Sequence, residues 1–359
     1  MFTCTISRHV QRTCIRNCLI ALGAAFLASS TIASAQQPQI PTGGPIPDRR
    51  GFNNRINDPA AVAEVEVIVR HVAGHVYVIA GAGGNIAVQA GDDGLLLVDN
   101  NFAVFYDEIM DRIRQISEKP IRIVVNTHSH PDHVQNNANM SRQGALVYAH
   151  PNTRLAIMRQ GQPQAPAVGG ATAANAPPTN PNAPAPVPPA GWPTITAAEP
   201  LTFHFNGEDV LFVPLKPSHT NGDVAVYFTG SDVWAFGDVY TTDYPSIGVA
   251  QGGTIENFID NYDMALEMTT PDTIFLPGHA QLSTRADLIA NRDAISTIHD
   301  RFVEMVAQGM TLEQVRAARP SKEFDARYAT ENFAPNDLQN STRWYEQMYN
   351  EAKTHLGER

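Results

Sequence analysis

Four short apolar runs open the patterned part of the chain. Each run is rich in β-branched residues, and glycine-containing stretches separate the runs as turns separate the strands of a meander. The runs cover 65–69, 75–79, 85–89 and 95–98. This pattern predicts four antiparallel strands, with order beginning near Ala63.

After Asp99 the apolar spacing becomes helical. Apolar residues recur every three or four positions from Phe105 to Ile116, and Pro120 ends this predicted helix. Downstream we expect strands at 121–125, 145–149, 201–205, 210–213, 224–228, 233–236 and 273–276, and helices at 134–142, 152–159, 255–268, 285–308, 310–318 and 339–355. This order of elements predicts an α+β fold of two mixed sheets with helices on the outside.

Two segments lack this patterning. Residues 36–62 are rich in Pro, Gly, Asn and Arg, which predicts a flexible N-terminal arm. Residues 160–193 are dominated by Pro, Ala, Gly and Asn, which predicts an insertion that is either disordered or a functional flap docked through Trp192. We therefore divide the chain into a domain at 63–310, which carries this insertion, and a C-terminal helical extension at 311–359.

The first 35 residues have the composition of a secretory signal peptide. Three arginines and no acidic residue precede the apolar run 18–28, and Ala33-Ser34-Ala35 forms a small-residue cleavage site. The apolar run is shorter than the about 20 residues that a stable membrane span needs. We expect Sec-type export to a periplasm or out of the cell, with no stable membrane insertion after cleavage; an uncleaved N-terminal anchor is the alternative.

Loss of this segment changes the chemistry open to the mature chain. The cysteines, Cys4, Cys14 and Cys18, would all be removed, which excludes disulfides, thiolate nucleophiles and cysteine-bound metals. The net charge would move from −11 to −14, because three arginines leave with no acidic residue. Such a charge disfavours nucleic acid and anionic membranes as partners. We therefore expect a small-molecule substrate, and the sequence leaves the oligomeric state open.

One polar stretch, 126–133, directly follows an apolar strand and is hard to explain as packing. It contains, within six residues, His128, His130, Asp132 and His133. Clustered polar groups must be paired or exposed, and imidazole and carboxylate are typical zinc ligands. The stretch is therefore a candidate metal site.

Further candidate ligands lie just past the ends of later predicted strands; they are His219, Asp238 and His279. Loops beyond the carboxyl ends of neighbouring strands converge on one edge of a sheet. The predicted ligand sets are His128, His130 and His219 for one ion, and Asp132, His133 and His279 for a second. Asp238 is then free to bridge, and the whole set fits two Zn²⁺ sites with positions left open for water.

These segments occur in the order found in the metallo-β-lactamase superfamily, which the chain resembles. The stretch from His128 to His133 is similar to the family's His-x-His-x-Asp-His signature. The later segments that resemble the family's remaining motifs are Ser218–Asp223, Phe236–Asp238 and Pro277–His279, and the opening meander ending at Val98-Asp99 also matches. The resemblance covers about Val65 to His279.

The resemblance implies an αβ/βα sandwich with a dinuclear zinc site at its edge, iron or manganese being the alternative metals. It implies the same two ligand sets with Asp238 as the bridge. It also implies that Asp99 and Asp223 support the site through hydrogen bonds. The implied reaction is hydrolysis by a hydroxide held between the metals, with Asp132 orienting the water and taking its proton.

Asp238 separates the chain from one branch of the family. True metallo-β-lactamases commonly have Cys or Ser there, whereas glyoxalase II and lactonases resemble this chain in having the bridging Asp. The favoured function is an exported hydrolase of a small ester, lactone, thioester or amide. The alternatives are a periplasmic β-lactamase, a mononuclear iron persulfide dioxygenase of the same fold, and a metal-binding protein without activity. Val134–Asn137, where the family often has glycines, is expected to alter the floor of the cleft.

Other polar residues near the site allow two interpretations. His150 follows a strand end, and Tyr240 and Tyr244 follow Asp238, so each is a candidate substrate contact. For the two tyrosines, packing of the aromatic rings under the loop is the favoured interpretation. The remaining histidines outside the signal peptide are expected to be structural or exposed: His71, His75, His204, His299 and His355.

Overall fold

The computed structural model describes residues 40–42, 44–47, 52, 55–160, 184–328 and 338–357, except the side chains of 338–343. The predicted signal peptide and residues 161–183 of the predicted insertion lie outside the described residues. Among the helices described, none combines the length and apolar character needed to cross a membrane.

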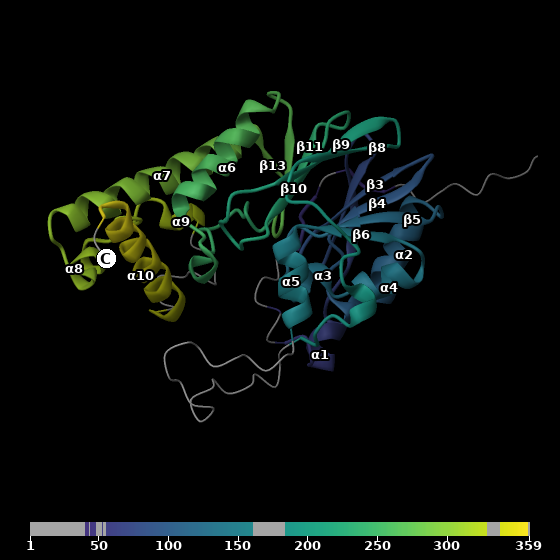
Figure 1. Ribbon diagram of the computed structural model, residues 1–359, viewed down its shortest axis with the longest axis horizontal. Helices are drawn as coiled ribbons and strands as arrows, with labels where there is room; N and C mark the ends of the chain where they lie inside the picture. The colour runs from purple at the N-terminus through teal and green to yellow at the C-terminus, as the bar shows by residue number, and fades with distance from the viewer. Residues whose placement is uncertain are drawn as a thin grey trace, which may run out of the picture. The chain divides into compact units, whose positions relative to one another are not determined.

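The first sheet starts as the predicted meander and continues with parallel strands (Figure 1). Its strands are β1 (Ile68–Ala73), β2 (Val76–Ala80), β3 (Ile86–Gly91), β4 (Gly94–Val98), β5 (Ile121–Val125), β6 (Leu146–Ala149) and β7 (Ile195–Thr196). The first four pair antiparallel, and β4 to β7 pair parallel. Since β4 and β5 are parallel, the loops that carry Asp99 and the 126–133 stretch start at the same edge.

The second sheet is mostly antiparallel, in the order β13-β12-β11-β10-β9-β8. Its strands are β8 (Leu201–Phe205), β9 (Glu208–Pro214), β10 (Val224–Phe228), β11 (Val233–Gly237), β12 (Ile274–Pro277) and β13 (Ser283–Thr284). A turn at Asn206-Gly207 joins β8 to β9, and both residues have positive φ. β11 and β12 pair parallel, so Asp238 and His279 leave this sheet at one edge.

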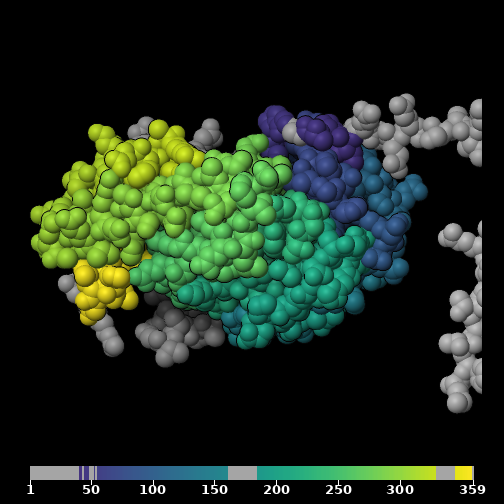
Figure 2. Space-filling model, turned by 90° about the horizontal axis from the view of Figure 1, so that it is seen from above, coloured from purple at the N-terminus to yellow at the C-terminus, as the bar shows by residue number. Residues whose placement is uncertain are grey.

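Helices cover the outer face of each sheet. An apolar cluster that includes Val78, Leu96, Phe212 and Val226 fills the space between the sheets. Further clusters pack α2 (Tyr106–Ile116) on the first sheet, and α6 (Ile255–Glu267) and α7 (Arg285–Ala307) on the second. In Figure 2 the second sheet's segment, in teal, lies between the blue first sheet and the green C-terminal helices. These layers confirm the predicted αβ/βα sandwich.

The remaining helices are short, apart from the last. They are α1 (Pro59–Ala63), α3 (Pro131–Val134), α4 (Asn137–Arg142), α5 (Pro151–Arg159), α8 (Leu312–Ala318), α9 (Asp325–Tyr328) and α10 (Leu338–His355), with 3-10 turns η2 (Ala103–Phe105), η4 (Pro189–Gly191) and η5 (Val249–Gln251). The predicted bounds of the helix at 134–142 are therefore wrong. It is divided into α3 and α4, because the backbone N–H of Asn136 donates to Asn100 Oδ1 instead of continuing α3.

The described residues of the predicted arm pack against the domain. Ile46, Phe52 and Ile56 are 3%, 5% and 6% exposed, and Thr42 bridges to His71 of β1. The prediction of a flexible arm is thus wrong for these residues, because isolated apolar side chains anchor a segment that has no regular period.

Both flanks of the predicted insertion pack beside the ligand stretch. Trp192 contacts an apolar cluster formed by Val134, Ile157 and Val187. Gln160 Nε2 donates to the carbonyl of Ser129 at 2.7 Å. The described ends of the insertion therefore lie next to the predicted metal loop.

The C-terminal helices share a core with the second sheet. Trp344 and Met348 of α10 belong to the same buried cluster as Trp234 and Phe236 of β11. The segment that we predicted as a C-terminal helical extension thus contributes to the layer that covers this sheet.

The start of α7 carries a pH-dependent cap. Thr284 and Asp287 form a capping box, with Asp287 Oδ2 accepting from Thr284 N at 3.0 Å. Partial burial would raise the pKa of Asp287, but the hydrogen bonds from Thr284 and the charge of Arg327 lower it below 3.8. A carboxyl with a depressed pKa stabilises the fold above its unfolded pKa, and this stability is lost as the pH falls through its folded pKa.

Replacing Asp287 by Ala should lower the free energy of unfolding by about 1 kcal/mol or less near neutral pH. Because the capped carboxylate is protonated in acid, the difference from the parent protein should shrink as the pH falls below 3.8. Urea unfolding of both proteins at neutral and acidic pH measures this. An equal difference at both pH values would contradict the assignment.

Candidate metal centre

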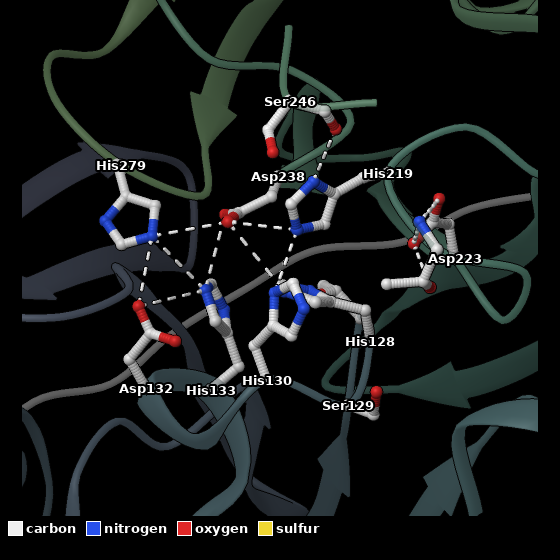
Figure 3. Close-up of polar contacts among 12 residues, drawn as sticks. His128, Ser129, His130, Asp132, His133, His219, Asp223, Asp238, Ser246 and His279 are labelled. Atoms are coloured by element: carbon white, nitrogen blue, oxygen red, sulfur yellow. Dashed lines mark hydrogen bonds and ion pairs between the residues drawn. The ribbon is translucent and has the colours of Figure 1, made fainter. Parts of the chain in front are cut away.

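The predicted ligand stretch leaves β5 and turns at once into α3. Pro131 occupies the first position of α3, where its missing N–H is not needed and its fixed φ favours the turn. His130 precedes the helix, whereas Asp132 and His133 lie inside it. Figure 3 shows these side chains grouped with residues that come from the second sheet. The centre therefore lies where the edges of two sheets meet, and not at the edge of one sheet as the strand pattern suggested.

The first donor group brings together three imidazoles and a carboxylate. His130 Nδ1 lies 3.1 Å from His128 Nε2 and 2.9 Å from His219 Nε2. Asp238 Oδ2 lies 3.8 Å from His128 Nε2 and 3.5 Å from His219 Nε2. Ligand atoms about 2.0–2.1 Å from a tetrahedral zinc are roughly 3.3 Å apart. The spacing of this group fits one such ion.

The second donor group consists of Asp132, His133 and His279. His279 Nε2 lies 3.3 Å from Asp132 Oδ2 and 3.4 Å from His133 Nε2. Asp238 reaches this group as well, with Oδ2 at 3.4 Å from His279 Nε2 and Oδ1 at 3.3 Å from His133 Nε2. One carboxylate thus contacts both groups, which is the position of a bridging ligand (Figure 3).

The chemistry of these donors fits divalent metal ions. Asp238 Oδ1 is buried and has no hydrogen-bond partner among the described residues. A buried carboxylate is costly unless it is paired or coordinates a metal. The other donors are imidazoles and one further carboxylate, without a thiolate, as zinc and similar ions accept. The structure thus brings together all seven residues predicted as ligands.

Two of the imidazoles are held at the ring nitrogen that faces away from the donor groups. Asp99 Oδ2 accepts from His133 Nδ1 at 2.7 Å. Thr127 Oγ1 donates to the same Asp99 oxygen at 2.7 Å and lies 3.0 Å from His128 Nδ1, whose proton it can accept. Both rings therefore keep the lone pair of Nε2 for a metal, as outer hydrogen bonds to ligand histidines do.

The loop that carries His219 is folded by Asp223. Asp223 Oδ2 accepts from the backbone N–H of Thr220 at 2.8 Å and from the hydroxyl of Ser218 at 3.2 Å. Burial raises the pKa of Asp223. The His219 ring is oriented separately, because its Nδ1 donates to the carbonyl of Ser246 at 2.9 Å. Asp223 therefore supports the loop, and Ser246 supports the ring.

Asn85 holds the loop of His279, a role that the sequence patterns did not reveal. Its Nδ2 donates to the carbonyls of Pro277 and Ala280 at 3.0 and 3.1 Å, and its N–H donates to that of Gly278 at 2.7 Å. In the sequence this residue is visible as an Asn just before an apolar strand. Spacing alone does not tell which distant loop such an amide reaches.

Burial and neighbouring charges shift the pKa values of the ligands in the two donor groups in different directions. Burial lowers the pKa of His130 to about 4. Burial would also lower the pKa of His279, but Asp238 and Asp132 raise it to about 9. Burial would raise the pKa of Asp132, but His133 and His279 lower it to about 2. His130 is therefore neutral and ready as a ligand, whereas a metal beside His279 must displace a proton.

Buried amides form the floor of the ligand stretch where the family often has glycines. Asn137 Oδ1 accepts from Asn100 Nδ2 at 2.6 Å and from Asn126 Nδ2 at 3.0 Å. Asn136 Nδ2 donates to the carbonyls of Asn100 and Phe102 at 2.8 and 2.9 Å. These hydrogen bonds join the start of α4 to the loop after β4.

The candidate substrate contacts are placed differently from the ligands. His150 caps α5, its Nδ1 accepting from Asn152 N at 3.1 Å, and burial lowers its pKa. Tyr240 is 1% exposed, and Tyr244 is 4% exposed with its hydroxyl donating to Asp325 at 2.8 Å. Both tyrosines are therefore buried, as the packing interpretation expects, since the chain after Asp238 turns into the core under the helices.

Replacing Asp99 by Asn should weaken metal affinity about 10- to 100-fold, because the amide cannot supply the charge that holds His133. Competition for zinc with a chelator of known affinity measures this change. The matched control is Asp111→Asn, which alters a carboxylate on the exposed face of α2. Equal zinc affinity in both variants would contradict the role of Asp99.

Replacing Gly278 by Ala should reduce both metal content and activity, because a Cβ there would overlap Asp238 Oδ1 and the backbone of Gly237. Metal analysis and turnover measure the effect. The control is Gly309→Ala, where no atom lies within 4 Å of the added Cβ and only the strain of φ +77° is introduced. Unchanged metal content in Gly278→Ala would show that Asp238 can move freely, against the fixed position described above.

The comparison with known families supports the pattern of motifs. The model of the metallo-beta-lactamase superfamily matches residues 74–279, which includes both donor groups. No curated protein sequence matches the chain.

Solved structures share the fold at low sequence identity. A double mutant of the sec-alkyl sulfatase PisA1 is similar with a TM-score of 0.55 and 18% identity, over 80% of this chain and 50% of that one. This chain thus spans about half the length of that alkyl sulfatase. The metallo-beta-lactamase from Pontibacter korlensis has a TM-score of 0.49 and 14% identity, over 64% and 99% of the two chains. DIM-1 metallo-beta-lactamase has a TM-score of 0.49 and 17% identity, over 65% and 99%.

Proposed function

Because the chain belongs to the metallo-beta-lactamase superfamily, we propose that it is a dinuclear zinc hydrolase of a small ester, lactone, thioester or amide. The observation that carries the proposal is the shared carboxylate of Asp238. It contacts both donor groups, at 3.4 Å from His279 Nε2 and 3.5 Å from His219 Nε2. A mononuclear site at the first group would use Asp238 but would leave Asp132, His133 and His279 without an ion.

The two ions would be held by the two donor groups described above. When bound, they supply Lewis acidity, which polarises a substrate oxygen and lowers the pKa of a bound water to about 7. The chain's own contribution is to fix the ligands. Asp99 and Thr127 orient the rings of His133 and His128, and Asn85 positions the loop of His279.

Asp132 is the residue that we assign to proton transfer. It is 6% exposed and belongs to the second donor group, with Oδ2 at 3.3 Å from His279 Nε2, so its carboxyl group would lie beside a water held by that group. The low pKa of Asp132, about 2, keeps it ionised near neutral pH and able to accept a hydrogen bond from water.

A panel of substrates with chelator controls tests the proposal. The panel contains lactones, thioesters, carboxylic and phosphate esters, a chromogenic β-lactam, and secondary alkyl sulfates, the substrate class in the printed name of PisA1. We expect turnover of at least one oxygen or sulfur ester, lost with a chelator and restored by zinc. Turnover that survives full metal removal, or oxygen uptake with one iron per chain, would contradict the proposal.

We also propose where the chain is located and which class of substrate it takes. The composition of residues 1–35 supports export to a periplasm or out of the cell. The net charge of −11 supports a small molecule, rather than nucleic acid, as the substrate.

A further inference from the structure

A third group of ligand-type side chains lies on the helical layer, on elements that carry none of the seven donors. Glu256 is the second residue of α6, His299 lies within α7, and His355 is the last residue of α10. One donor atom from each lies within 4.8 Å of the other two. α6 and α10 both contact α7, and Figure 1 shows all three within the C-terminal helical layer. The group thus joins three helices that are distant in the sequence.

Contacts within this group are already close. His355 Nδ1 lies 2.5 Å from Glu256 Oε1, and these side chains are 45% and 50% exposed. The rings of His299 and His355 meet edge to face, with centroids 5.7 Å apart. An exposed pair therefore lies over a buried imidazole.

Two buried polar atoms at this junction lack a hydrogen-bond partner among the described residues. They are His299 Nε2 and Glu351 Oε2. The two side chains are only 6% and 10% exposed, and His299 Nε2 lies 4.0 Å from Glu351 Oε1, too far for a hydrogen bond. Each buried polar atom without a partner costs about 1–3 kcal/mol. Such atoms call for a ligand.

The purely structural interpretation explains only part of the arrangement. Glu351 Oε1 accepts from Ile255 N at 2.6 Å and so caps the first turn of α6. The pair of His355 and Glu256 has the geometry of an ordinary surface ion pair. Neither contact uses Glu351 Oε2 or His299 Nε2. Glu351 and His355 are also one helical turn apart, so both present their donors on the same face of α10.

We propose that Glu256, His299, Glu351 and His355 bind one divalent transition-metal ion of the zinc type. Two imidazoles with carboxylates are a donor set that zinc accepts, and four protein ligands make a closed, structural site. The ion would fasten α10 to α6 and α7. It would give the two orphaned atoms a common partner. This site is independent of the hydrolytic centre.

Zinc titration of the full chain tests the proposal. After removal of metals, the parent protein should bind one more zinc per chain than His355→Ala or Glu256→Gln, or bind it roughly 100-fold more tightly. Both substituted side chains are exposed, so the variants are expected to fold, and their hydrolytic activity should equal that of the parent. Zinc should also raise the melting temperature of the parent more than that of either variant.

The matched control is His204→Ala, which breaks an exposed histidine–aspartate pair of 2.6 Å on the second sheet, away from these helices. It should bind zinc as the parent does. A further arm combines Asp238→Ala, His130→Ala and His279→Ala, which leaves only two ligands in each donor group of the hydrolytic centre and should still bind one zinc. The proposal is overturned if that triple variant binds none, or if His355→Ala and Glu256→Gln match the parent and His204→Ala in zinc number and affinity.

Discussion

Asp238→Ala should lose nearly all hydrolytic activity, by about a thousandfold or more. The carboxylate contacts both donor groups, so its removal weakens both metal sites at once. Metal ions contribute several kcal/mol to stabilising a hydrolytic transition state, and each 1.36 kcal/mol is tenfold in rate. Turnover and metal content per chain, measured on the same preparation, test the expectation.

The control for this variant is Asp260→Ala. It removes a surface carboxylate of α6 that is paired with Lys216. It should keep parent activity and metal content. If Asp238→Ala keeps its metals and loses less than tenfold in turnover, the carboxylate does not bridge the two groups.

His279→Ala should remove the second ion and leave the first. His279 belongs to the second donor group, whereas the first group retains its three imidazoles and Asp238. Turnover should fall by at least about a hundredfold, since one ion alone supplies less charge stabilisation. Metal analysis with turnover separates this outcome from general unfolding, because one bound metal shows that the first group is intact.

This variant also separates the proposed function from its mononuclear alternative. A mononuclear enzyme that used only the first group would keep full activity in His279→Ala. His204→Ala serves as the matched control, because it removes an exposed imidazole elsewhere on the second sheet. Full activity with one metal per chain in His279→Ala would contradict the dinuclear account.

The sequence patterns predicted two sheets with helices outside because the buried strands are continuous apolar runs, and the family resemblance implied the sandwich. β5 and β10 coincide with predicted strands in both bounds. The two-residue strands β7 and β13 were missed, since segments this short carry no period. The break between α3 and α4 was also missed, because it depends on a hydrogen bond to Asn100 from another loop.

The donor residues were predictable because each follows the end of an apolar strand and because their motifs resemble those of a known family. Their supports were less predictable. Thr127, Ser246 and Asn85 act through contacts that the chain makes only after folding, and the bond from Asn85 to Pro277 spans 192 positions. The tyrosines after Asp238 show that nearness in sequence alone does not place a side chain at the site, since both are buried where the chain turns into the core.

Anomalous scattering at the zinc absorption edge, from crystals of the zinc-loaded protein, tests the central claim most directly. The account predicts two strong peaks about 3.5–4 Å apart. One should lie among His128, His130 and His219, the other among Asp132, His133 and His279, with Asp238 between them. A single peak at the first group, or no peak at either group, would contradict it.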